Sequence, residues 1–213
     1  LSSLSRNFSD RVNKLENKIF KISGSEFNIG SPKQLSEVLF DNMGLTLSKK
    51  TKTGERSTGI EVLEDLSYEG HEIAQLIIEW RQLSKLKNTY ADSLPNHIVK
   101  ETGRIHTSYA MASTSTGRLA SSDPNLQNIP IRTNEGRLIR KAFVADKGNL
   151  IFSADYSQIE LRVLAHIADV SQLKQAFNNN EDIHQLTASE IFNVSLNKVT
   201  ADLRRKAKAV NFG

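Results

Sequence analysis

The segment that most restricts the possible folds is a junction between a predicted strand and a predicted helix. Residues 149–152 are mostly apolar and follow Gly148, a pattern typical of a short buried strand after a turn. Beyond them, apolar residues recur at helical spacing: Ile159, Val163 and Ile167, with Leu164 beside them. Asp155 therefore lies where a strand ends and a helix begins.

Asp155 has two interpretations at such a junction. It can cap the following helix, which is the commoner role of an aspartate in this position. Alternatively, its carboxylate faces a cleft at the end of the strand, where a divalent cation with oxygen ligands could bind. The residues in the rest of the chain decide between the two interpretations.

The composition is that of a globular protein. The chain has 213 residues, of which 38% are hydrophobic and 24% charged, and its net charge of +4 is compatible with a polyanionic partner. It contains no cysteine, which excludes disulfides and thiolate metal sites. No apolar run approaches the roughly 20 residues of a membrane span, and no signal peptide is visible, so we expect a cytoplasmic protein. The chain starts at Leu1 and stops within a helical pattern, so we expect it to be a piece of a longer protein.

The first part of the chain is predicted to be helical up to about residue 93. A long amphipathic helix runs from about residue 72 to 87, with Arg81 and Lys85 on one polar face. The basic segment 48–57 has no apolar period. Both features are compatible with binding of phosphates and also with an ordinary solvated surface.

A change of pattern follows residue 104. Residues 105–109 alternate as in a strand, and residues 114–119 and 124–130 are rich in turn formers and amide side chains. Amide and hydroxyl groups in such loops can bond to sugars and base edges of a nucleic acid.

Helices are predicted again after residue 170. Near the start of one of them, Asp182 can cap the helix and His184 can be a polar surface residue. On the last helix, Arg204, Lys208 and Phe212 lie at i, i+4 and i+8. Such cations can hold phosphate oxygens and the ring can stack on a base, although a surface helix with one core Phe shows the same spacing.

The run DYSQIELR at residues 155–162 resembles the first carboxylate motif of family A DNA polymerases, the bacterial DNA polymerase I group. Other segments resemble that family in the same order along the chain: its thumb at residues 31–35 and 85–90, its primer-template segment at 116–119 and 124–130, and its nucleotide-binding segments at 182–184 and 204–213. Several motifs in order are far more specific than any one of them.

The resemblance implies an α+β fold shaped like a right hand, mostly helical with a small antiparallel palm sheet. Residues 1–93 would form the thumb, residues 94–170 part of the palm, and residues 171–213 the start of the fingers. The expected partners are primer-template DNA and deoxynucleoside triphosphates, and the protein is expected to be a monomer associated with the nucleoid.

The resemblance also implies the chemistry, in which a primer 3′-hydroxyl attacks the α-phosphorus of a deoxynucleotide with two Mg²⁺ ions at the site. Asp155 and the backbone carbonyl of Tyr156 would bind metal. Lys208 would hold the triphosphate and protonate the leaving group. The implied nucleotide-binding residues are Gln158, Glu160, His184, Arg204, Lys208 and Phe212, with Glu160 beside the sugar C2′. The implied DNA-binding residues are Arg81, Lys85, Lys87, Arg118, Asn125, Gln127 and Asn128.

Two departures from the family pattern matter. Ala120 stands where the family often has Ser, and the family's later segment with the second aspartate is absent. We therefore expect the 213 residues alone to be inactive. A non-catalytic DNA-binding relative and a phage-type RNA polymerase are the alternatives, and Glu160 argues against the second because an RNA polymerase must admit the 2′-hydroxyl.

Overall fold

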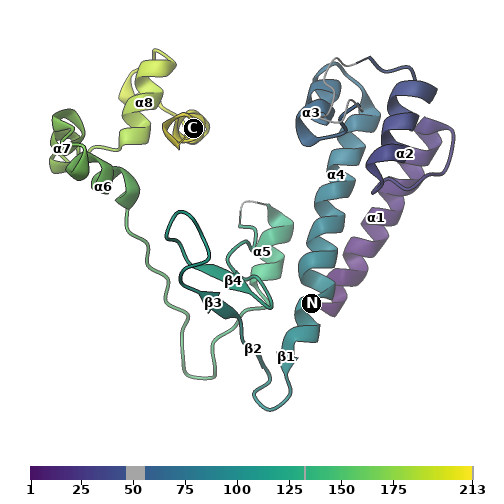
Figure 1. Cartoon of the computed structure of the whole chain (residues 1–213), viewed down its shortest axis with the longest axis horizontal. Helices are drawn as coiled ribbons and strands as arrows, with labels where there is room; N and C mark the ends of the chain where they lie inside the picture. Colours follow the sequence, from purple (N-terminus) through teal and green to yellow (C-terminus); the bar gives the residue numbers. More distant parts are fainter. Residues whose placement is uncertain (47–55, 132, 213) are drawn as a thin grey trace. The chain divides into compact units, whose positions relative to one another are not determined.

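The computed structural model describes residues 1–46, 56–131 and 133–212, and of Phe212 the backbone alone. It divides into two compact units, Leu1–Asn149 and Leu150–Gly213, which are drawn in Figure 1 and described separately below. Most of the predicted basic segment, residues 48–55, lies outside the described residues. Within the described ranges, no helix is long and apolar enough to cross a membrane.

Unit 1 is built on two long helices that pack along each other, α1 (Ser2–Ser23) and α4 (Glu72–Leu86) (Figure 1). Two shorter helices, α2 (Pro32–Ser36) and α3 (Ile60–Tyr68), and the π-helical turn η1 (Glu37–Asn42) complete the bundle. The core contains side chains with no exposed surface: Phe8, Ile19, Leu35, Leu39, Leu63, Leu66 and Ile77. Burial of these apolar groups provides most of the driving force for folding of the bundle.

The helix ends follow from local chemistry. Gly24 ends α1 in the left-handed conformation, at φ 74°, and its N–H donates to the carbonyl of Phe20. Such a φ is cheap only for glycine. The side chain of Ser31 accepts from the N–H of Gln34 and so caps α2.

The rest of unit 1 is short elements and loops. Two π- or 3₁₀-helical turns, η2 (Lys87–Asp92) and η3 (Leu94–His97), continue from α4. Two small antiparallel sheets follow, β1 (Ile98–Val99) with β2 (Arg104–Ile105) and β3 (Ser108–Ala110) with β4 (Ala120–Ser122). The helix α5 (Asn134–Arg140) is capped by Thr133.

The predicted strand over residues 105–109 is divided between β2 and β3. Between the two strands, the hydroxyl of Thr107 lies 2.7 Å from that of Ser121 and 2.8 Å from the carbonyl of Pro124. These side-chain bonds compete with a continuous ladder.

Unit 2 contains α6 (Ile159–Ile167), α7 (Ser171–Asn178), α8 (Ile183–Ile191), the 3₁₀ turn η4 (Leu196–Lys198) and α9 (Ala201–Phe212). A small apolar core joins α6, α7 and α8: Leu161, Ala165, Ala176, Phe177 and Ile183. The helices α8 and α9 pack against each other.

Two predictions near Asp155 are wrong. Residues 149–152 form no strand, and Leu150 and Phe152 are 94% and 89% exposed. A strand needs a partner for its N–H and C=O groups, and none of the described strands pairs with this segment. On α6 the predicted apolar face is exposed, and the buried side chains are Leu161 and Ala165, which face α7.

Candidate nucleotide and nucleic-acid binding sites

Asp182 joins the start of α8 to the first turn of α9. Its Oδ1 accepts from the N–H of Gln185 at 3.1 Å, which caps α8. Its Oδ2 accepts from Nε and Nη2 of Arg204 at 2.8 and 2.7 Å. Partial burial acts to raise the pKa of Asp182, but the hydrogen bonds from Arg204 and Gln185 outweigh it and the pKa is lowered. The cap prediction is confirmed, and the carboxylate has a second role that the sequence did not indicate.

His184 is buried between α8 and α9, with 2% of its surface exposed. The amide nitrogen of Asn211 lies 2.9 Å from its Nδ1 and 3.2 Å from the hydroxyl of Thr187. Burial, then the positive charges of Arg204 and Lys208, lower the pKa of His184 against the opposing effect of Asp182. The imidazole is therefore neutral at pH 7, and the interpretation of His184 as a surface residue is wrong.

The last helix carries two cations on one face. Thr200 caps α9 by accepting from the N–H of Leu203 at 3.3 Å, and Arg204 and Lys208 then lie one turn apart. Arg204 is partly buried against Asp182, whereas Lys208 is exposed. The side chain of Phe212 lies outside the described residues. Two cations one turn apart are suited to a ligand with several phosphate groups.

Asp155 does not cap α6. The N-cap of that helix is Gln158, at φ 55°, and the carboxylate of Asp155 and the side chain of Tyr156 are exposed before it. The amide oxygen of Gln158 is buried and accepts no hydrogen bond from the described residues. Glu160 is exposed in the first turn of α6. Across the described ranges, no three His, Cys, Asp or Glu side chains come together as metal ligands.

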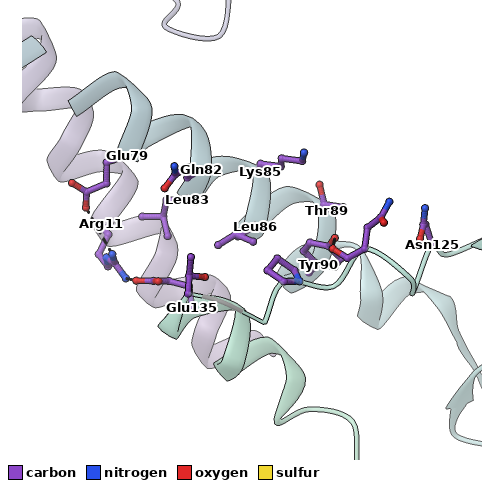
Figure 2. Close-up of a pocket in the computed structure, with 13 residues that line it drawn as sticks. Arg11, Glu79, Gln82, Leu83, Lys85, Leu86, Thr89, Tyr90, Asn125 and Glu135 are labelled. Atoms are coloured by element: carbon purple, nitrogen blue, oxygen red, sulfur yellow. Dashed lines mark hydrogen bonds and ion pairs between the residues drawn. The ribbon is translucent and has the colours of Figure 1, made fainter. Parts of the chain in front are cut away.

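A pocket of ≈ 620 Å³ in unit 1 is lined by three of the predicted DNA-binding residues, Lys85, Asn125 and Asn128. Figure 2 labels the first two of them. The hydroxyl of Tyr90 donates to the carbonyl of Asn128 at 2.5 Å, which fixes the amide-rich loop to η2. Burial raises the pKa of Tyr90, so this donor keeps its proton. Thr89 also lines the pocket, one turn after Lys85. Thr89 was not predicted, although its position four residues after Lys85 could have placed it on the same helical face.

The other predicted DNA-binding residues have structural partners or lie on the surface. Arg81 donates from Nη1 to the carbonyl of Thr58 at 2.6 Å, and burial lowers its pKa. Lys87 lies 2.6 Å from the carboxylate of Asp92. The side-chain amide of Gln127 accepts from the N–H of Ser121 in β4 and donates to the carbonyl of Leu119. Arg118 is exposed. Lys85, Asn125 and Asn128 are exposed as well, and Oδ1 of Asn125 accepts from the N–H of Gln127 at 3.0 Å.

Comparison with known proteins adds to this geometry. The sequence profile of DNA polymerase family A matches residues 1–213. The chain belongs to DNA polymerase family A.

Relatives of this family A chain are similar along its whole length. It is 55% identical to DNA polymerase I of Rhizobium leguminosarum over 213 residues, which is 100% of the chain and 21% of that protein. It is 52% identical to DNA polymerase I of Geobacillus stearothermophilus, again over 100% of the chain and 24% of that protein. The chain thus spans about a fifth to a quarter of these relatives.

A solved structure of a family A polymerase supports the fold. The polymerase domain of Pol1 from M. smegmatis, in complex with DNA primer-template and dNTP, matches 99% of this chain and 37% of its own. The identity is 42% and the TM-score 0.88. The predicted α+β fold, mostly helical with small antiparallel sheets and similar to a right-hand polymerase domain, is confirmed.

An ion pair between α1 and α5 should make the free energy of unfolding of this chain depend on pH. Arg11 lies 2.7 Å from Glu135 and 3.8 Å from Glu79 at one end of the pocket (Figure 2). The hydrogen bond from Arg11 lowers the pKa of Glu135 from its usual 4.5. Because the folded state has the lower pKa, the pair stabilises above the unfolded pKa, and this contribution is lost as the pH falls through the folded value.

Glu135→Gln should therefore lower the free energy of unfolding by less than about 1 kcal/mol near pH 7, since the pair is partly exposed. The difference from the wild type should vanish at acid pH. Urea unfolding from about pH 7 to pH 3 measures this. Glu26→Gln, on an exposed loop, is the control and should show no such dependence. An equal difference between wild type and Glu135→Gln at every pH would contradict the role of the ion pair.

Proposed function

We propose that this chain is part of a DNA polymerase I, an enzyme that transfers deoxynucleotides to a primer 3′-hydroxyl under the direction of a template in DNA replication and repair. The observation that carries the proposal is its match, over nearly the whole chain, to a polymerase domain solved with primer-template and dNTP. Residues 1–93 would be the thumb, residues 94–170 part of the palm, and residues 171–213 the start of the fingers.

The nucleotide would bind at the face of α9 that carries Arg204 and Lys208. A guanidinium binds phosphate oxygens through a planar fork, and an ammonium acts beside it as a compact charge. Lys208 is also suited to protonate the leaving pyrophosphate. His184 would donate one hydrogen bond to a phosphate oxygen only after a local movement of α8 and α9, because it is 2% exposed and its Nδ1 lies 2.9 Å from the amide nitrogen of Asn211. Phe212 would stack on the sugar or base.

The residues around Asp155 suit a magnesium ion in their chemistry. Mg²⁺ is usually held by one or two carboxylates together with substrate phosphates and waters, so a three-ligand protein cluster is not required. Asp155 offers an exposed carboxylate and Tyr156 a backbone carbonyl, and Gln158, whose buried amide oxygen has no donor among the described residues, would support the nucleotide site beside them. When bound, the metal would supply charge stabilisation of the attacking and leaving oxygens. Asp155 would place a negatively charged carboxylate, with its oxygen ligands, beside the primer end.

Glu160 would select the sugar. Its exposed side chain in the first turn of α6 would fill the space beside C2′, so that an added hydroxyl clashes. This role favours a DNA polymerase over an RNA polymerase.

The DNA would be held by residues of unit 1. Lys85, Asn125 and Asn128 line one pocket, and Arg118 on its exposed loop would read acceptors in the minor groove of the primer end. Gln127, Arg81 and Lys87 would contact the DNA as well, although their side chains already bond within unit 1. Base-edge readout in the minor groove suits a polymerase because every correct pair presents similar acceptors there.

The longer protein that contains this chain should extend a primer on a template with deoxynucleotides and Mg²⁺, whereas the 213 residues alone should not. In the longer protein, Lys85→Ala should reduce the slope of log K against log salt for DNA binding by about 1, because one phosphate contact is lost. Fluorescence anisotropy with a primer-template duplex measures this.

Lys18→Ala, on the exposed surface of α1, is the control and should keep the wild-type slope. Binding of DNA by the longer protein without any incorporation would overturn the enzyme proposal and support a non-catalytic DNA-binding relative. An unchanged slope for Lys85→Ala would remove that residue from the DNA interface.

A further inference from the structure

We propose that Asp182 is a positioning residue for Arg204, which it holds in the one orientation suited to receive the phosphates of the nucleotide. This inference rests on the proposed function, in which Arg204 contacts the triphosphate. Asp182 itself would not touch the nucleotide.

The geometry of the carboxylate carries the proposal. One oxygen, Oδ2, accepts from both Nε and Nη2 of Arg204, at 2.8 and 2.7 Å. The other oxygen, Oδ1, accepts from the backbone N–H of Gln185 at 3.1 Å. The start of α8 therefore fixes the carboxylate, and the carboxylate in turn restricts the side chain of Arg204 on α9.

In this orientation, the guanidinium of Arg204 has a second edge that can bind an anion. Nε and Nη2 form one edge of the guanidinium, and the carboxylate occupies this edge. Nη1 lies on the other side of the planar group, so its N–H groups point away from Asp182. The side chains of Arg204 and Asp182 are 41% and 30% exposed, so an anion from solvent can reach the guanidinium without breaking the pair.

Fixing Arg204 in advance should favour nucleotide binding. A free arginine side chain loses considerable rotamer freedom when it binds a phosphate, and a side chain already held by its neighbours loses less. The nearby charges still favour an anion, since Arg204 and Lys208 exceed Asp182 by one positive charge and burial lowers the pKa of His184, which keeps it neutral.

A competing interpretation predicts the opposite sign. If Asp182 only occupied Arg204 in place of a phosphate, removal of its charge would release the guanidinium and strengthen nucleotide binding. If Asp182 positions Arg204, removal of its charge weakens binding. One substitution therefore separates the two.

Asp182→Asn is that substitution. Asn caps a helix about as well as Asp, so α8 keeps its start. Its single oxygen cannot serve both Gln185 and Arg204, and its amide N–H groups would oppose the guanidinium. Asp182→Ser, which caps but cannot reach Arg204, is a second variant in case the first fails to fold.

Asp202→Asn is the matched control. Asp202 lies in the first turn of the same helix and pairs with Arg205 and, at 3.0 Å, with Lys206. Its replacement removes one negative charge from α9, as Asp182→Asn removes one from the start of α8, and it leaves the bonds of Arg204 to Asp182 in place. Changes common to both variants report on the charge and stability of α9 and not on the position of Arg204.

The test is steady-state and single-turnover incorporation by the longer polymerase, with primer-template saturating and one dNTP varied. Asp182→Asn and Asp182→Ser should each raise the KM for dNTP about tenfold and leave kcat nearly unchanged, whereas Asp202→Asn should leave both unchanged. In an Arg204→Ala background, Asp182→Asn should add no further loss, because the side chain that it positions is gone.

Each other outcome overturns the inference. A lower or unchanged KM for both Asp182 variants, with a large loss for Arg204→Ala, shows that Asp182 does not position Arg204 and leaves the proposed function intact. A loss for Asp182→Asn of equal size with and without Arg204 shows that Asp182 acts elsewhere. If Arg204→Ala itself leaves the KM unchanged, the proposed contact of Arg204 with the nucleotide fails together with the inference.

Discussion

Asp155→Asn should lower the rate of nucleotide incorporation by the longer polymerase about 10²–10⁴-fold, which corresponds to several kcal/mol of lost transition-state stabilisation. Asn has nearly the size of Asp but lacks its negative charge, so the variant tests the charge and not the shape. The carboxylate is exposed, and Gln158, not Asp155, occupies the N-cap position of α6, so loss of helix stability cannot account for such a fall. Single-turnover primer extension at several Mg²⁺ concentrations measures it.

The controls for this variant separate binding from chemistry. Asp155→Asn should bind primer-template DNA as the wild type does, because the proposed DNA contacts lie in unit 1. Asp10→Asn makes the same change on the exposed surface of α1 and should extend primers normally. A wild-type rate for Asp155→Asn over the whole Mg²⁺ titration would remove Asp155 from the proposed metal site, and the proposed mechanism with it.

Some helix boundaries could be predicted from the sequence, because residues next to the end of the helix decide them. Gly24 ends α1, Ser31 caps α2 and Thr200 caps α9, and each is a residue type that favours its position. The apolar period of α1 also places Phe8, Leu15 and Ile19 in the core. In each case the partners lie within a few residues, so the pattern contains all the necessary information.

The two wrong predictions near Asp155, the strand over residues 149–152 and the buried face of α6, have a different cause. Periodicity shows which residues share a face, but not which face a neighbour covers. The side of α6 that carries Val163 and Ile167 is exposed, while Leu161 on another side packs on α7. Likewise, an apolar run forms a strand only if another strand pairs with it, and residues 149–152 have no such partner among the described strands.

In the candidate site, too, features set by neighbouring residues could be predicted and contacts between distant residues could not. The i, i+4 spacing of Arg204 and Lys208 could be read directly from the sequence and places both on one face of α9. The pair between Asp182 and Arg204 joins residues 22 positions apart, and the burial of His184 depends on the packing of α8 against α9. The partners of Arg81 and Lys87 could not be predicted from the sequence either, because helical spacing does not show whether a cation bonds to another part of the protein.

Lys208→Arg should reduce the rate of the chemical step about 10²-fold while the affinity for dNTP changes little. An arginine keeps the positive charge beside the phosphates, but a guanidinium does not release its proton at any working pH. The ammonium of lysine can release one to the leaving pyrophosphate. Lys208→Ala should lose both the affinity and the rate, because it removes the charge as well as the proton donor. Pre-steady-state incorporation at varied dNTP concentration separates the two constants.

Lys206→Arg is the matched control on α9. Lys206 is exposed, lies two residues before Lys208, and pairs with Asp202 at 3.0 Å, so the same change there should alter neither constant. If Lys208→Arg keeps the wild-type rate, Lys208 is a phosphate ligand only, and the proton must reach pyrophosphate from another donor or from water.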